Sequence, residues 1–256
     1  MTYIASEEEA RPILERIRAE GLPVGLDTEF YGLDIREQSP VARSVCHVFS
    51  LAIPDGPIHP RGHHECTSWV LDGSLLRVDC VRAVLEDPEI HKPVHNQPVD
   101  HHTIRNAGVR LRGAVNTLQM ARFILPSRVK GRGFDLDSLG EDLVGVGKST
   151  SYKELLGYEA VEEFTEDVMR AVCVCGATGC RKRKGDHWAV DEVMVSVTRK
   201  RKVQKLIPLT DLHQKHPLWE RYVAYAARDA VLAVQIYEHL LRLGQQERPY
   251  PWPSLL

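Results

Sequence analysis

The spacing of apolar residues predicts a helix near each end of the chain. Ser6 and Glu9 match the pattern of a capping box, apolar residues then recur at helical spacing as far as Ile17, and Gly21 ends the segment. Toward the C-terminus, residues 220–243 keep a helical alternation of apolar and polar positions for more than twenty residues. Both helices are predicted from pattern alone.

Short apolar runs predict strands in the first half of the chain. Residues 24–30 and 45–53 are such runs, and residues 92–95 form a shorter one. The stretch that follows residue 53 is rich in proline and glycine, and it predicts an irregular region.

Helices alternate with strands after that region. An apolar stripe predicts a helix over residues 74–86. Asn96 is predicted as the N-cap of a helix that runs to about Ala107 and stops at Gly108, and a strand and a helix follow over residues 114–125. This order favours an α/β fold with a mixed central sheet flanked by helices.

Composition and charge narrow the class of protein. The chain has 256 residues, of which 43% are hydrophobic and 27% charged, with a formal net charge of −2. These values are typical of a globular protein with a core. No apolar run reaches the ~20 residues of a membrane span, and three glutamates stand where a signal peptide would be basic. We therefore expect a cytoplasmic protein with no membrane partner.

Candidate chemistry begins on the first long strand, at Asp27-Thr28-Glu29. Residues two apart on a strand project from the same face, so the two carboxylates would point together. Their repulsion is relieved by a divalent cation, and oxygen ligands suit Mg²⁺ or Mn²⁺. The alternative is that these acids end a strand in solvent.

Two further motifs have helical spacing. Asn96 precedes Asp100 by four residues, and Tyr225 precedes Asp229 by four, so each pair would share one helix face. Asp229 lies among small and apolar residues, where a buried carboxylate needs a partner. The alternatives are simple helix capping at Asn96 and an exposed acid at Asp229.

In their order along the chain, these three motifs resemble those of the DEDD, or DnaQ-like, 3′→5′ exonuclease superfamily. Residues 20–157 and 206–243 resemble the proofreading exonuclease domain of family A DNA polymerases. Because Tyr225 stands four residues before Asp229, the chain resembles the tyrosine subtype, although Asn116 replaces an Asp found in many relatives. The resemblance implies a ribonuclease H-like fold.

The same resemblance implies a mechanism. The enzyme would hydrolyse phosphodiester bonds at single-stranded or frayed 3′ ends of DNA and release nucleoside 5′-monophosphates. Its metal ligands would be Asp27, Glu29, Asp100 and Asp229, which would hold two Mg²⁺ or Mn²⁺ ions that stabilise the attacking and leaving oxygens. Tyr225 would orient the attacking water, since a phenol of ordinary pKa is a weak base at pH 7.

Two residues near these motifs are candidates for nucleic-acid binding. Asn96 would hydrogen-bond the strand or the loop beside Asp100. Phe30 would stack on an unpaired base. The alternative for Phe30 is ordinary packing in the core.

Residues 158–205 form an insertion in what is otherwise a single exonuclease domain over residues 1–256. Cys173, Cys175, Cys180 and His187 have the ligand types and number of a structural Zn²⁺ site. Their spacing differs from that of standard zinc fingers, and the alternative is a set of reduced surface thiols.

The insertion also concentrates positive charge. Residues 181–205 contain nine Lys or Arg against three acidic residues. Alternating residues predict a two-stranded ribbon over 191–207 whose turn is formed by Arg199, Lys200, Arg201 and Lys202. Such a basic ribbon would guide a phosphate backbone. The alternative is a solvated basic loop.

Three interpretations of function stay open from sequence. The first is a DNA exonuclease acting alone or with a separate DNA polymerase, and the insertion resembles one in phage-encoded relatives, which implies a bacterial or phage-infected host cell. The second is an RNA 3′-end exonuclease, because DTEF also resembles the first motif of RNase D-like enzymes. The third is a non-catalytic nucleic-acid-binding module. The region around Asp100 favours DNA.

Overall fold

The computed structural model describes residues 1–31, 44–56, 65–126, 133–147, 150–173 and 189–247. The chain forms two compact units. The larger comprises Met1–Leu155 and Pro208–Leu256, and the smaller comprises Leu156–Ile207. None of the helices in the described parts of the chain is both long and apolar enough to cross a membrane.

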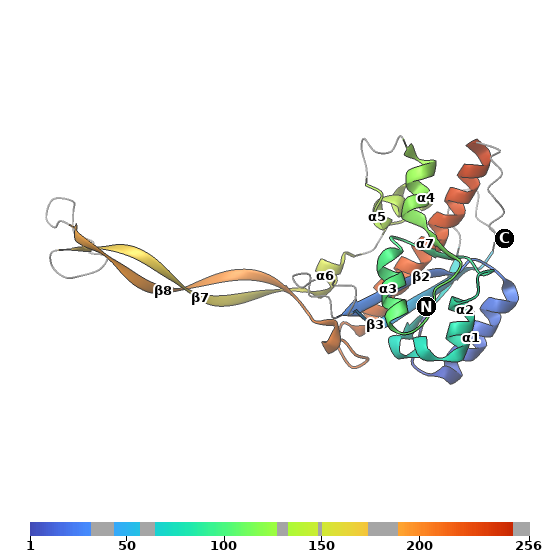
Figure 1. Ribbon diagram of the computed structural model, residues 1–256, viewed down its shortest axis with the longest axis horizontal. Coiled ribbons are helices and arrows are strands. Elements are labelled where there is room, and N and C mark those ends of the chain that lie inside the picture. The colour runs from blue at the N-terminus through green and yellow to red at the C-terminus, as the bar shows by residue number, and fades with distance from the viewer. Residues whose placement is uncertain (32–43, 57–64, 127–132, 148–149, 174–188, 248–256) are drawn as a thin grey trace. The chain divides into compact units, whose positions relative to one another are not determined.

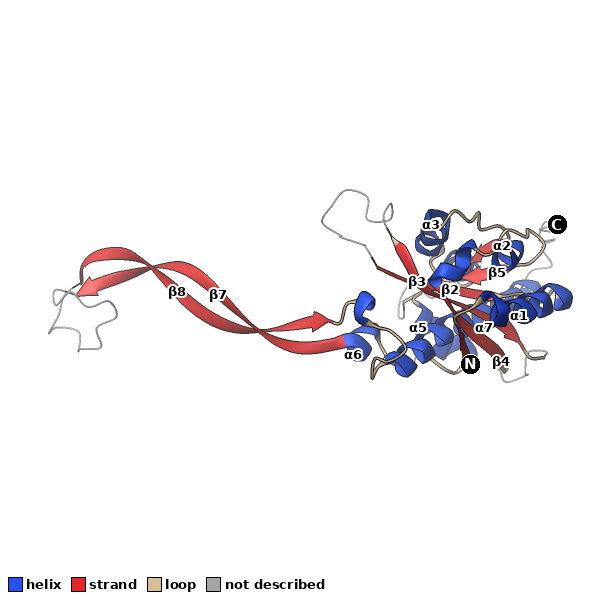
Figure 2. Cartoon of the chain, turned by 90° about the horizontal axis from the view of Figure 1, so that it is seen from below, coloured by secondary structure: helices blue, strands red, loops and turns tan. Residues whose placement is uncertain are grey.

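The larger unit is built on a six-stranded mixed sheet, drawn in red in Figure 2. Its strand order is β1-β4-β3-β2-β5-β6. Strand β3 runs antiparallel to β2 and β4, and the remaining neighbours are parallel. The strands are β1 (Thr2–Ile4), β2 (Gly25–Tyr31), β3 (Val45–Pro54), β4 (Cys66–Asp72), β5 (Lys92–Val94) and β6 (Ala114–Asn116).

Helices cover both faces of this sheet, which confirms the predicted α/β fold with a mixed central sheet (Figure 1). Helix α7 packs on β2 and β3 from one side, and α1 and α2 bury their apolar residues against the other side. The helices are α1 (Glu7–Glu20), α2 (Asp79–Leu85), α3 (Pro98–Asn106), α4 (Thr117–Ile124), α5 (Leu136–Leu139), α6 (Tyr152–Leu156) and α7 (Trp219–Glu247).

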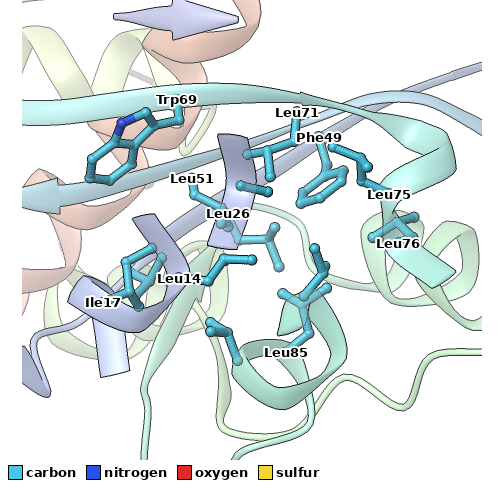
Figure 3. Close-up of a cluster of buried hydrophobic side chains, with 14 of the residues drawn as sticks. Leu14, Ile17, Leu26, Phe49, Leu51, Trp69, Leu71, Leu75, Leu76 and Leu85 are labelled. Atoms are coloured by element: carbon cyan, nitrogen blue, oxygen red, sulfur yellow. The ribbon is translucent and has the colours of Figure 1, made fainter. Parts of the chain in front are cut away.

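The main hydrophobic core lies between the sheet and helices α1 and α2. Figure 3 shows Leu14 of α1 and Leu85 of α2 beside Leu26, Phe49 and Leu71 of three strands. These three strand residues are fully buried. Because side chains alternate along a strand, this packing sends the neighbours of Leu26 to the opposite face, which carries α7.

Close contact between α7 and β2 depends on Gly25. A Cβ atom at this position would lie 2.0 Å from the Ala230 carbonyl oxygen, so no larger residue fits without moving the helix. The glycine therefore lets α7 approach the strand backbone. This approach sets the distance between side chains of α7 and those of β2 that follow Gly25.

The ends of the first predicted helix are confirmed. Ser6 accepts a hydrogen bond from the backbone N–H of Glu9, and Glu9 reaches back to the N–H of Ser6. Gly21 follows in the left-handed conformation, with φ of 61°. This conformation suits glycine at a helix C-terminus.

The predicted N-cap of the helix that carries Asp100 is wrong. Asn96 has φ of 58°, a left-handed conformation outside the helix, and α3 begins at Pro98 after Gln97. Asparagine tolerates this backbone better than most residues, so it turns the chain from β5 toward the helix. Asp100 still lies in the first turn of α3, as predicted.

In the larger unit, two strands and one helix break were not predicted. Strands β1 and β4 have no counterpart in the sequence assignment, and β4 falls in the region predicted as irregular. The helix predicted over residues 74–86 is interrupted at Val78, whose φ of −80° and ψ of 138° are extended. A short 3₁₀ helix, Gly73–Arg77, precedes this break.

The smaller unit is an antiparallel ribbon of β7 (Gly157–Cys173) and β8 (Ala189–Leu206), coloured yellow to orange in Figure 1. The predicted turn at Arg199–Lys202 is wrong, because all four residues lie within β8. Their segment contains no glycine, proline or asparagine to form a turn, and it is flanked by Val197, Thr198 and Val203, which favour strands.

Charge pairing across the ribbon neutralises this basic segment. Every one of the four cations contacts a glutamate of β7. Opposite charges facing each other across an antiparallel pair stabilise it modestly. The pairs are Arg199–Glu166 at 2.7 Å, Lys200–Glu163 at 2.7 Å, Arg201–Glu162 at 3.2 Å and Lys202–Glu159 at 2.8 Å.

Candidate active site

Three of the predicted carboxylates meet between β2 and α7. Asp27 and Glu29 project from one face of β2, and Asp229 approaches from α7. One oxygen from each lies within 4.8 Å of the other two. Asp229 is 5% exposed, while Asp27 and Glu29 are half-buried. Like charges this close repel strongly unless a proton or a cation intervenes.

The fourth predicted carboxylate, Asp100, lies on α3 and is hydrogen-bonded to β2 at Thr28. Its Oδ1 atom accepts hydrogen bonds from the Thr28 backbone N–H at 2.9 Å and the Thr28 hydroxyl at 2.8 Å. Thr28 lies between Asp27 and Glu29, so these hydrogen bonds tie α3 to the segment of β2 that carries the two carboxylates. Asp100 is 5% exposed.

Burial dominates the electrostatics of Asp100. Burial raises the pKa of this carboxyl from 3.8 to about 7. The hydrogen bonds from Thr28 lower the pKa, and the negative charge of Asp229 raises it further. The ionised form therefore costs free energy in the folded protein without a cation.

Tyr225 lies one helical turn before Asp229 and faces the same group. Burial raises its pKa well above the usual value, and the charges of Asp229, Glu29 and Asp27 raise it further. The phenol therefore keeps its proton at any pH near neutrality. It can position a water molecule by hydrogen bonding, and with its proton retained it is a poor general base.

Tyr152 is a site residue that sequence reasoning missed. It stands at the start of α6, and its ring centroid lies 6.1 Å from that of Tyr225. The available signal was an S-x-x-E pattern, because Ser151 and Glu154 form reciprocal hydrogen bonds of 2.8 and 3.2 Å that begin the helix. Recognising this cap would have placed Tyr152 on a first helical turn.

A cleft of about 750 Å³ opens beside the carboxylates. Among the predicted residues, Asp27, Asn96, Tyr225 and Asp229 line it, and Asn96 is exposed. Phe30 is half-buried on β2 and is not among the described residues of this wall, so its stacking role stays a prediction. The full described wall is formed by Asp27, His95, Asn96, Leu118, Arg122, Phe134, Asp135, Leu136, Asp137, Thr150, Ser151, Tyr152, Glu154, Tyr225 and Asp229.

The donor set fits a divalent cation. Three carboxylates within 4.8 Å offer hard oxygen ligands, which Mg²⁺ and Mn²⁺ prefer. The expected zinc site lies mostly outside the described residues. Cys173 ends β7, while Cys175, Cys180 and His187 lie outside the described residues.

Comparison with known proteins places the chain in a family. Residues 1–170 match the model of a 3′-5′ exonuclease family of the DNA polymerase A type. The chain is 27% identical over 222 residues to DNA polymerase I A of Arabidopsis thaliana, covering 84% of this chain and 18% of that protein. It is 30% identical over 142 residues to the mitochondrial DNA polymerase I B of Oryza sativa subsp. japonica, covering 53% of this chain and 14% of that protein. The chain thus spans less than a fifth of the length of these two relatives.

Solved structures share its fold. Brucella melitensis NrnC has a TM-score of 0.53 at 13% identity, covering 96% of this chain and 81% of that chain. NrnC has also been solved with bound Mg²⁺ and bound to pGG. The POL domain of Pol1 from M. smegmatis, in complex with DNA primer-template, has a TM-score of 0.52 at 12% identity, covering 96% of this chain and 28% of that chain. The predicted family and the ribonuclease H-like fold are confirmed, and this chain belongs to the 3′-5′ exonuclease family of the DNA polymerase A type, whose members are nucleases.

Proposed function

We propose that this chain removes nucleotides from single-stranded or frayed 3′ ends of DNA and releases nucleoside 5′-monophosphates. The observation that carries the proposal is the meeting of Asp27, Glu29 and Asp229 within 4.8 Å beside an open cleft. The choice of DNA is supported by the family match and by the DNA polymerases among its relatives.

The proposed ligands are Asp27, Glu29, Asp100 and Asp229, and the proposed metals are two Mg²⁺ or Mn²⁺ ions. When bound, such ions stabilise the charge that develops on the attacking and leaving oxygens and lower the pKa of water. The Mg²⁺ bound to NrnC, which shares the fold, supports this proposal.

The chain's own residues supply orientation. Thr28 fixes the Asp100 carboxylate through two hydrogen bonds, so this ligand is held in one orientation before any cation arrives. Tyr225 keeps its proton and would hold the attacking water by a hydrogen bond. Asn96, exposed in the cleft, would hydrogen-bond the strand.

Other proposed roles lie away from the cleft. A structural zinc ion at Cys173, Cys175, Cys180 and His187 is tested by elemental analysis of the purified protein. Arg199–Lys202 are proposed to contact the phosphate backbone, and they would exchange their glutamate partners for phosphates. A separate DNA polymerase is the proposed partner, as the named relatives are themselves polymerases.

An RNA 3′-end exonuclease is the second candidate function. It is favoured by the shared fold with NrnC, which has been solved bound to pGG. Both candidates use the same carboxylates and differ in the nucleic acid that they bind. Recognition of RNA depends on contact with the 2′-hydroxyl.

Degradation of matched DNA and RNA strands, labelled at either end, tests the function. With Mg²⁺ or Mn²⁺, a 3′-labelled strand should release labelled mononucleotide at once, while a 5′-labelled strand should shorten stepwise. DNA should be degraded faster than RNA of the same sequence.

Variants of the carboxylates complete this test. Asp27→Ala and Asp229→Ala should lose cleavage and keep the fold, whereas Glu8→Gln, on the exposed side of α1, should behave as the unaltered protein. Full activity in either aspartate variant would refute the site.

A further inference from the structure

Arg122 is a cleft residue to which the proposed mechanism gives no role. It lies in the last turn of α4, its side chain is exposed, and it lines the cleft beside the carboxylates. Its guanidinium carbon lies 6.0 Å from the centroid of the Phe134 ring, which lines the same cleft. A cation over an aromatic face is attracted to it, so the stack limits the positions of the guanidinium group.

Arg122 is the one arginine or lysine among the described residues of the cleft wall. That wall also carries Asp135 and Glu154, whose carboxylates are engaged in capping. Asp135 accepts a hydrogen bond from the Ser138 backbone at 2.9 Å, and Glu154 accepts one from the Ser151 backbone at 2.8 Å. A polyanionic strand that enters this acidic cleft needs a cation outside the carboxylate group, and Arg122 supplies one.

The chemistry of 3′-end removal decides which phosphate Arg122 can meet. When the last nucleotide leaves as a 5′-monophosphate, the scissile phosphate joins the last two nucleotides. No phosphate lies on its 3′ side, so every other phosphate of the strand lies on its 5′ side. The scissile phosphate is held at the proposed metal site, so a cation of the cleft that contacts any other phosphate contacts the upstream backbone.

We propose that Arg122 binds a phosphate on the 5′ side of the scissile bond and thereby positions polynucleotide substrates. This inference rests on the proposed exonuclease function. The planar guanidinium group can donate two parallel hydrogen bonds to phosphate oxygens, and its stack on Phe134 reduces the freedom lost on binding. Arg122 is a positioning residue. It should therefore raise kcat/KM for substrates that have an upstream phosphate and have little effect on those that lack one.

Two substrates separate this role from a structural one. The first is a 3′-labelled single strand of six nucleotides, and the second is the p-nitrophenyl ester of thymidine 5′-monophosphate, which has a scissile phosphate and no upstream phosphate. The kcat/KM of both is measured with Mg²⁺ for the unaltered protein, Arg122→Ala and Arg122→Lys. Arg105→Ala, an exposed arginine of α3 outside the described cleft wall, is the matched control.

The expected result is a change in the ratio of the two activities. In Arg122→Ala, the ratio of kcat/KM on the strand to kcat/KM on the ester should fall by about tenfold or more, the usual effect of losing a hydrogen bond to a charged group. Arg122→Lys should restore only part of the ratio, since it restores the charge but not the two parallel hydrogen bonds or the stack on Phe134. Arg105→Ala should leave the ratio unchanged.

A binding measurement gives a second, independent readout. In an Asp27→Ala background, affinity for a fluorescent strand is titrated at several salt concentrations. Arg122→Ala should make the slope of log affinity against log salt shallower by about 0.7, the value for one phosphate contact on a single strand. This readout needs no cleavage.

The outcomes are distinguishable. Equal losses on strand and ester, or an unchanged salt slope, would overturn the role of Arg122 while leaving the exonuclease function in place. Absence of cleavage of every substrate by the unaltered protein would overturn the proposed function instead, and the salt slope would still decide whether Arg122 contacts phosphate.

Discussion

Asp100 is a buried acid whose ionised form destabilises the folded protein. Its pKa is raised to about 7 because burial outweighs the hydrogen bonds from Thr28. An unfolded aspartate ionises near pH 4. Between about pH 4 and pH 7 the unfolded chain therefore releases a proton that the folded chain retains, and this linkage lowers stability as the pH rises.

Replacing Asp100 by asparagine should stabilise the protein in the absence of divalent metal. The asparagine side chain cannot ionise, and its carbonyl oxygen can still accept hydrogen bonds from Thr28. The gain in unfolding free energy should be about 1 kcal/mol at pH 5, grow until the pH reaches about 7, and level off above it at on the order of 4 kcal/mol. Urea unfolding at pH 5, 6, 7 and 8 measures it.

Asp135 is a control, because its pKa is shifted in the opposite direction to that of Asp100. Its pKa is lowered, first of all by the hydrogen bond from the Ser138 backbone. Asp135→Asn should therefore lose stability at neutral pH, and the loss should shrink as the pH falls below about 4. A gain for Asp100→Asn that did not change with pH would contradict the assignment of its raised pKa.

Removal of the Tyr225 hydroxyl should slow catalysis without weakening metal binding. In Tyr225→Phe we expect kcat to fall by about a hundredfold, the lower range for loss of a positioned group, while affinity for Mn²⁺ stays within about twofold. Because the pKa of Tyr225 is raised, the pH–rate profiles of variant and unaltered protein should have the same shape between pH 6 and 9. A limb of the profile that vanished with the hydroxyl would show a general base instead. Tyr158→Phe, on the ribbon, is the control.

At the scale of elements, the sequence predicted those helices and strands whose periodicity or cap lies within a single short segment. The capping box at Ser6, the strand that carries Asp27 and Glu29, and the long helix α7 were all predicted, since each has its own periodicity or cap. Strand β4 was missed because turn residues precede it and its pairing with β3 is a tertiary contact. The ribbon was mispaired because β8 pairs with β7, and the partners of Arg199–Lys202 lie 35 to 41 residues upstream, outside the window that pattern reasoning uses.

In the candidate site, too, local spacing was predictable from the sequence and contacts between elements were not. Motif spacing named the four acids and Tyr225, and the structure brings Asp27, Glu29 and Asp229 together. Motif spacing could not reveal the hydrogen bonds of Thr28 to Asp100 or the stack of Arg122 on Phe134, because each of these contacts joins residues from separate elements. Asn116, which departs from many relatives, acts locally, since its side chain caps α4 by accepting hydrogen bonds from the backbone of Leu118 and Gln119.

The ribbon is electrically balanced where its side chains are described. Residues 157–167 carry five acidic side chains and no basic ones, and residues 196–206 carry five basic side chains and no acidic ones. The cations of β8 are thus masked by β7. Their exposed ion pairs contribute little to stability, so they can be exchanged for contacts with a phosphate backbone.

Neutralising the glutamates should therefore strengthen strand binding, if Arg199–Lys202 contact phosphate. We expect a variant with Glu159, Glu162, Glu163 and Glu166 changed to Gln to bind a single strand more tightly, with a steeper dependence on salt. The matched variant with Arg199, Lys200, Arg201 and Lys202 changed to Gln should bind less tightly. Fluorescence anisotropy at low and moderate salt measures both. Equal affinities of the two variants at low salt would remove the ribbon from the nucleic-acid interface.

At the scale of the whole molecule, the division into two units separates the proposed chemistry from the ribbon. The four proposed ligands, Tyr225 and the cleft wall all belong to Met1–Leu155 and Pro208–Leu256. The ribbon leaves and rejoins the chain at one point, because the Ile207 backbone N–H donates to the Leu156 carbonyl at 2.9 Å. The chain can thus be closed at this pair by a short turn.

Replacing residues 157–206 with Asn-Gly should leave a folded nuclease. This dipeptide favours a two-residue turn between antiparallel neighbours, which is the geometry that Leu156 and Ile207 require. Thermal unfolding should remain cooperative, and hydrolysis of the p-nitrophenyl ester should stay within a few-fold of the full chain, since every proposed catalytic group is retained. Affinity for a long strand should fall if the ribbon binds the backbone. Loss of ester hydrolysis in a protein that still unfolds cooperatively would mean that the ribbon contributes to catalysis, and the carboxylate site would then be incomplete without it.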